Sequence, residues 1–352
     1  MAQIVLGVGT SHSPLLVLGA DDWALRSADD RRNRGLNTLD GRMLSYDALV
    51  AERGEPYTAE SNPADFAALA RRAEQALDRL AEAIAAARPD LLLVVGDDQG
   101  ELFGQEHMPA LAVFCGDELV MRPAEHLDHA PPWATSAFWA GYRMDLPHRY
   151  PGAPAIAQDL ARALIRQDVD VSVVRRVVDP TQRGFGHAFG FIIERLVRDH
   201  AVPMLPVLLN TYFPPNTPTS ARCFEIGTKI AAALAASPAA ARVAVIASGG
   251  LSHFLCEEAF DRRLLAALRS KDIDTLAQIP QEALLSGSSE IRNWITVAGM
   301  VGHLELDFME YIPVRRTPLG TGIGLGFVTW GAGEARSGRP SRSALQMTEE
   351  QA

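Results

Sequence analysis

The segment 243–255, VAVIASGGLSHFL, has the composition of a buried strand that ends in small residues. Its first part is apolar and β-branched, which favours a strand in the core, and His253 follows two glycines. Residues 4–16, IVLGVGTSHSPLL, repeat this pattern around His12. Because strand ends in a mostly parallel sheet open into the ligand crevice, we expect both histidines to lie beside a bound molecule.

Two further candidates lie at the ends of predicted elements. His187 lies between glycines in 183–196, RGFGHAFGFIIERL, and Glu290 lies near a predicted helix start in 286–299, SGSSEIRNWITVAG. Each has an ordinary structural explanation, since acids are favoured in a first helical turn and lone histidines are commonly structural. Imidazoles also serve as metal ligands and proton carriers near neutral pH. Together the four residues predict one assembled site.

Strands alternate with helices along the chain, which predicts an α/β fold with helices on both faces of a central sheet. The clearest helix is 63–88, with Asn62 as its cap and apolar residues at helical spacing. The predicted organisation is a single catalytic domain over residues 1–332. It carries a helical and loop insertion at about 20–62, and a disordered polar tail follows over 333–352.

Composition excludes several classes of protein. The 352 residues are 47% hydrophobic and carry a net charge of -10, with no basic face of the kind that nucleic-acid binding requires. Three cysteines without a close pair favour a reducing cytoplasm. The N-terminal residues lack the features of an export signal, and no apolar run is long enough to span a bilayer. We therefore expect a cytoplasmic protein without a membrane or nucleic-acid partner.

Other motifs are weaker. His126 and His129 in EHLDH have a spacing that could bind a metal on one helix face, but the prolines that follow favour solvated loop histidines. The glycines of 317–331 lack the strand-then-helix context of a dinucleotide site and predict a final strand. Asp97 and Asp98 end a buried strand, where they are either ligands or caps for the following residues.

Several motifs of this sequence, taken in their order along the chain, resemble those of the class III extradiol ring-cleavage dioxygenases. This superfamily includes the protocatechuate 4,5-dioxygenase beta subunit, gallate dioxygenases and 2,3-dihydroxyphenylpropionate dioxygenase. The resemblance runs through most of residues 3–331. Its pieces are TSHSPLL, VVGDDQGELF, GFGHAFGFIIERL, PVLLNTYFPP, SGGLSHF and SSEIRNW. SGGLSH and E-I-x-x-W are its more specific parts.

The resemblance implies a mixed central sheet and a non-haem Fe(II) held by two histidines and a glutamate, with positions left open for substrate and O₂. His12 matches the first histidine ligand and Glu290 the carboxylate ligand. His253 matches the acid/base that acts on the substrate hydroxyl. His187 matches a second active-site histidine, which binds substrate or transfers protons.

One position departs from the family pattern. The second iron histidine usually follows an aspartate, and this chain has Gln99 there. Three interpretations stay open. Gln99 coordinates through its amide oxygen; or the missing ligand is another group, with Asp98, His107, His126 and His129 as candidates; or the metal is lost. The retention of His12, His187, His253 and Glu290 favours a metal site, with Gln99 as its third member.

The predicted function is therefore Fe(II)-dependent extradiol opening of a catechol- or gallate-like ring by O₂. A homo-oligomer is expected, with a possible small accessory subunit, and residues 20–62 or the long loop 122–150 would form a lid or subunit contact. An anionic substrate would require an arginine, for which Arg183 is a candidate. The alternatives are a metal-independent lyase or hydrolase using His187 and His253, and a non-catalytic partner subunit.

Overall fold

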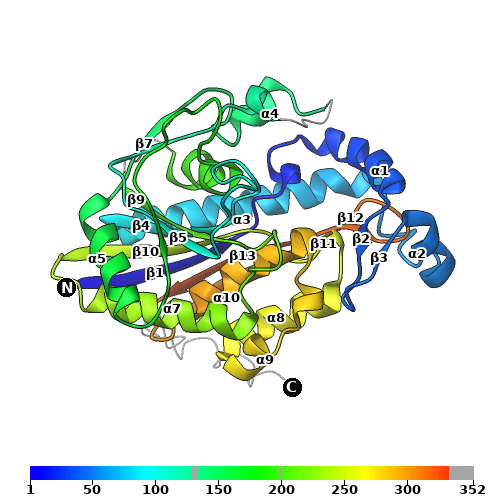
Figure 1. Cartoon of the computed structure of the whole chain (residues 1–352). Helices are drawn as coiled ribbons and strands as arrows, with labels where there is room; N and C mark the ends of the chain where they lie inside the picture. Colours follow the sequence, from blue (N-terminus) through cyan, green and yellow to red (C-terminus); the bar gives the residue numbers. More distant parts are fainter. Residues whose placement is uncertain (128–132, 199, 201, 333–352) are drawn as a thin grey trace, which may run out of the picture.

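The structure is a computed structural model that describes residues 1–127, 133–198, 200 and 202–332. A nine-stranded mixed sheet runs through its centre with helices on both faces, which confirms the predicted fold class (Figure 1). The predicted disordered tail, 333–352, lies outside the described residues. No helix in the described ranges is both long and apolar enough to cross a bilayer.

The order of the sheet is β11-β13-β1-β10-β4-β9-β5-β8, with β12 paired to β13. The central neighbours β1, β10, β4 and β9 are parallel, whereas β13 runs antiparallel to β1, β11 and β12. The strand bounds are β1 Ala2–Thr10, β4 Leu91–Gly96, β5 Leu111–Phe114, β8 Ser172–Val174, β9 Met204–Leu209, β10 Ala241–Ser248, β11 His253–Leu255, β12 Glu305–Arg315 and β13 Thr321–Gly331. Two small hairpins pair β2 Leu36–Asn37 with β3 Met43–Leu44, and β6 Glu118–Val120 with β7 Arg149–Pro151.

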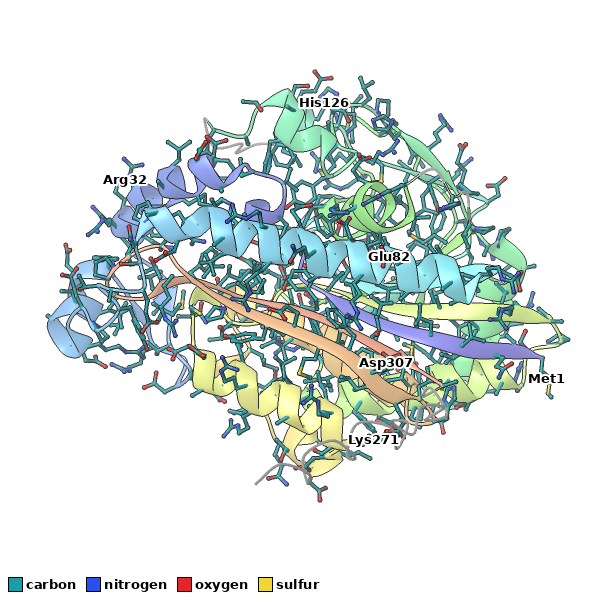
Figure 2. The ribbon with its side chains drawn as sticks, turned by 180° about the vertical axis from the view of Figure 1, so that it is seen from behind. Met1, Arg32, Glu82, His126, Lys271 and Asp307 are labelled. Carbon is teal, nitrogen blue, oxygen red and sulfur yellow. The ribbon has the colours of Figure 1, made fainter. Side chains whose placement is uncertain are left out.

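The core has two layers because the central strands are covered on both faces. Alternate residues of β4 face opposite ways: Leu93 packs into one hydrophobic cluster and Val94 into the other. One face is covered by α3, which lies along the sheet when the molecule is seen from behind (Figure 2), and the other by α5, α7, α8 and α10. The helix bounds are α1 Trp23–Arg32, α2 Tyr46–Arg53, α3 Phe66–Ala87, α4 Ser136–Ala140, α5 Pro154–Ile165, α6 His187–Phe191, α7 Ser220–Ala235, α8 Glu258–Ser270, α9 Ile273–Ala277 and α10 Ile291–Met300.

Three segments hold structure that the sequence patterns did not predict. Residues 305–315 form the long strand β12, whose charged residues obscure its pattern because one end of the strand is largely open to solvent. The polar stretch 20–62 carries α1 and the β2–β3 hairpin besides the one predicted helix, α2. The predicted loop 122–150 contains α4 and β7. These elements are short or edge-exposed, so little apolar periodicity marks them.

Candidate metal centre and active site

Four predicted or flanking residues converge at the carboxyl edge of the parallel strands. His12 follows β1, Asp97 follows β4, His187 opens α6 and Glu290 lies in the turn before α10. One potential ligand atom from each lies within 4.8 Å of those from the other three. The edge is shared because β1, β10 and β4 are parallel, so that their ends meet. Three of the four, all except Asp97, were named as site residues from the sequence.

His12 presents a free nitrogen to this cluster. The Ser248 hydroxyl donates to the Ala188 carbonyl at 2.6 Å, so its oxygen is left to accept from His12 Nδ1–H at 2.9 Å. Nε2 is then directed toward the cluster, 3.4 Å from Glu290 Oε2. This buried nitrogen has no hydrogen-bond partner among the described residues. A buried polar atom without a partner is costly, and a bound cation would satisfy it.

Glu290 is buried and anchored from two sides. Its Oε2 accepts the Gly250 amide at 2.5 Å, and its Oε1 accepts from Gln99 Nε2 at 3.2 Å. Burial alone would raise the pKa of Glu290, but the adjacent His12 lowers it below the ordinary value, so the carboxylate is ionised. Gly250 is required here because a Cβ at this position would lie 2.0 Å from the His253 ring.

The adjacent acids Asp97 and Asp98 have different surroundings. Asp98 caps the next turn, since its oxygens accept the Leu102 and Phe103 amides at 2.7 and 3.0 Å. Asp97 instead faces the cluster, and burial together with the charge of Glu290 raises its pKa. Both interpretations of this acidic pair therefore hold, one for each residue: Asp97 is a potential ligand and Asp98 is a cap.

His187 is held by an acid that the sequence patterns did not single out. Its Nδ1 lies 2.6 Å from Glu101 Oε1, and its ring packs edge-on to His12 with centroids 4.7 Å apart. Burial would lower the pKa of His187, but the Glu101 carboxylate and the other acids of the cluster raise it to about 10. Glu101 lies two residues after Gln99, and the signal available in the sequence was this third acid in VVGDDQGELF.

His253 lies beside the cluster, and one of its two ring nitrogens is available to accept a proton. Its Nδ1 bonds to the Leu251 carbonyl at 2.8 Å and must therefore carry the proton, which leaves Nε2 as a lone pair. Its backbone is fixed by Ser288, whose hydroxyl accepts the His253 amide and donates to the His253 carbonyl. Burial lowers the pKa of His253, so the ring is neutral at pH 7.

Gln99 contacts the cluster through its side-chain amide. Gln99 is exposed, and its Nε2 donates to Asp97 Oδ2 at 3.0 Å as well as to Glu290. The side chain therefore bridges the two carboxylates with its amide nitrogen. A side-chain amide NH2 group acts only as a hydrogen-bond donor and does not bind a cation.

The other candidates lie elsewhere. His107 is exposed and packs beside Phe103, His126 pairs with Glu125 at 3.3 Å, and His129 lies outside the described residues. Arg183 forms a surface ion pair with Glu106 at 2.7 Å rather than lining the cluster. Of the alternatives considered for the missing ligand, none of the described ones joins the four-residue cluster.

The donor set fits a divalent cation. Two buried carboxyl groups lie beside an imidazole nitrogen without a hydrogen-bond partner among the described residues, and carboxylate with imidazole is the donor combination of non-haem iron and manganese sites. His12, Asp97, His187 and Glu290 are the residues that could hold such an ion.

Comparison with known families identifies the family of this chain. The model of the catalytic LigB subunit of aromatic ring-opening dioxygenase matches residues 56–316. The chain belongs to this family. The match contains Gln99, His187, His253 and Glu290, whereas His12 precedes it. Membership confirms the predicted superfamily and supports aromatic ring opening by a dioxygenase as its general activity.

Proposed function

We propose that the protein is an Fe(II)-dependent extradiol dioxygenase that opens a catechol- or gallate-like ring. The observation that carries the proposal is the unpartnered His12 Nε2 facing two buried carboxylates in a chain of the LigB family. When bound there, Fe(II) would supply a Lewis acid that lowers the pKa of the substrate hydroxyls and a coordination position for O₂.

The protein itself supplies a positioned base. His253 is neutral, its Nδ1 is held by the Leu251 carbonyl, and its Nε2 is free to accept a proton from a substrate hydroxyl. The Ser288 clamp on the His253 backbone fixes where that nitrogen lies. The same nitrogen can return the proton when the ring has opened, which makes His253 both base and acid in one turnover.

We also infer that parts of the two segments 20–62 and 122–150 cover the site together. Arg26 of α1 lies over the Trp133 ring at 4.6 Å, and the Trp133 indole donates to Asp29 at 2.9 Å. Tyr142 extends this contact inward, since its hydroxyl donates to the His12 carbonyl at 2.7 Å. A cover of this kind would exclude water from the reacting ring.

The test is oxygen uptake by anaerobically iron-loaded protein on a panel of catechol, dihydroxybenzoates and trihydroxybenzoates. The proposal expects oxygen consumption in step with loss of the aromatic ring, and a large loss of rate in His253→Gln at unchanged iron content. Iron-loaded protein that consumes no oxygen with any of these rings would refute it. Turnover of a ring-derived substrate without metal would instead favour a lyase or hydrolase.

A further inference from the structure

The chain departs from its family at Gln99, and the structure indicates how the site is completed. We propose that His187 and Asp97, and not Gln99, complete the metal site that His12 and Glu290 begin. The inference rests on the proposed function only in taking a divalent cation to be bound among these residues. It changes the role that the resemblance implied for His187, from substrate binding or proton transfer to metal ligation.

The geometry of His187 is that of a ligating histidine. Metal-bound imidazoles almost always donate their second ring N–H to a carboxylate or other oxygen, which orients the ring. His187 has this partner in Glu101, whose carboxylate lies 2.6 Å from Nδ1 and also accepts the Gln99 backbone amide at 2.6 Å. Nε2 is left for the cluster, and on binding a cation it would give up any proton that it carries.

His12 and His187 form a matched pair. Each has Nδ1 fixed by an oxygen of a buried side chain, Ser248 for His12 and Glu101 for His187, and each is left with Nε2. Their rings meet at a 78° interplanar angle with centroids 4.7 Å apart, so the two nitrogens can converge on one ion. His253 does not belong to this pair, because the residue lies outside the four-residue cluster.

Asp97 supplies the second carboxylate. Both oxygens of its neighbour Asp98 accept backbone amides. Among the described residues, Asp97 accepts only the side-chain amides of Gln99 and, at 3.5 Å, Asn293. Asp97 is 2% exposed and Glu290 is 4% exposed, so two carboxyl groups are buried side by side. Buried charges need a counter-charge, and a divalent cation between these carboxylates provides one.

Gln99 then acts as a clamp on the ligands. Its Nε2 joins Asp97 Oδ2 to Glu290 Oε1 and leaves Glu290 Oε2, the oxygen nearest His12, toward the cluster. A histidine at position 99 would compete for the ion, and an amide instead orients the two carboxylates. Position 99 has thus changed from a ligand in the family pattern to a positioning residue here.

The test counts the histidines bound to Co(II), used as a paramagnetic probe in the anaerobic full-length protein. Each ligating imidazole shows one solvent-exchangeable, hyperfine-shifted ring N–H in the proton NMR spectrum. We expect two such signals in the wild type and in Gln99→Ala, but one in His187→Gln. His107→Gln, at an exposed histidine, is the matched control and should keep both. Asp97→Asn should weaken Co(II) binding by at least about tenfold.

Several outcomes would overturn the assignment. They are two signals retained in His187→Gln, loss of Co(II) binding in Gln99→Ala with His187→Gln unaffected, or no Co(II) binding by the wild type. If His187→Gln fails to fold, Glu101→Gln serves in its place and should shift one of the two signals and leave the other. Because Co(II) binding is measured without turnover, failure of the dioxygenase proposal would show separately, as absent oxygen uptake by protein with both signals.

Discussion

Asp261 and Glu290 are buried acids that both bond to the SGGLSH segment, and they differ in how completely their surroundings are hydrogen-bonded. Asp261, fully buried on α8, accepts three hydrogen bonds, from the Ser252 amide at 3.0 Å, the Ser252 hydroxyl at 2.6 Å and the Tyr311 hydroxyl at 2.8 Å. By contrast, Asp97 and Glu290 face the unpartnered Nε2 of His12. A buried network whose polar atoms all have hydrogen-bond partners stabilises the fold. A buried polar atom without a partner needs another explanation, and a bound ligand is one.

The largest effect that this contrast predicts is on metal affinity. Glu290→Gln keeps the shape of the side chain but removes a charged ligand, so Co(II) affinity should fall by more than the roughly hundredfold that loss of an outer partner costs. Calorimetric titration under anaerobic conditions measures it. Asp261→Asn is the control and should keep its affinity within about threefold. Equal losses in the two variants would remove the distinction between the two acid groups.

The converse effect is on folding. Asp261→Ala leaves the Ser252 amide and the Tyr311 hydroxyl without their acceptor, which should lower the free energy of unfolding by roughly 2–4 kcal/mol. Urea unfolding of the metal-free protein measures this loss. Asp170→Ala, at an exposed aspartate, should stay within about 0.5 kcal/mol of wild type. A similarly small loss for Asp261→Ala would show that this network does not stabilise the fold.

A pH dependence separates charge from hydrogen bonding at Asp261. Burial raises its pKa to about 7 from 3.8, so the folded state holds this proton more tightly than the unfolded state. The contribution of Asp261 to stability should therefore decrease as pH rises from about 4 to about 7, by as much as roughly 4 kcal/mol. Asp261→Asn has no such proton to lose, and its stability relative to wild type should rise across this window. A constant difference between pH 4 and pH 7 would contradict this.

The smallest predicted effect is a change in stability at Asp97, and we expect bound metal to reverse its sign. Asp97→Asn removes a buried carboxyl group whose ionisation is disfavoured by burial and by Glu290, so the metal-free variant should be more stable than wild type by roughly 1 kcal/mol. With saturating Co(II) the variant should become the less stable of the two, because ligand binding to the folded state stabilises the wild type more. Thermal unfolding with and without Co(II) checks both signs. A variant that is less stable in both conditions would place Asp97 with Asp261, among structural acids.

Much of the site was predictable because strand ends are recognisable. His12 and His253 were found from apolar runs that give way to small residues, and Glu290 was found from a predicted helix start. The parallel sheet brings the strand ends to one edge. The role of His187 could not be settled in this way, since it depends on Glu101, an acid 86 residues away that contacts its Nδ1. Neither residue type nor spacing encodes such a contact.

The sequence by itself determined the α/β class and the set of residues able to bind metal or move protons at the strand ends. Only the tertiary structure decided which role each of these residues has. Asp97 faces the cluster while Asp98 caps a turn, and Gln99 presents its nitrogen to two carboxylates. The physical reason is that side-chain direction and hydrogen-bond partners depend on backbone turns and on contacts between segments far apart in the chain, whereas local pattern reports only burial and periodicity.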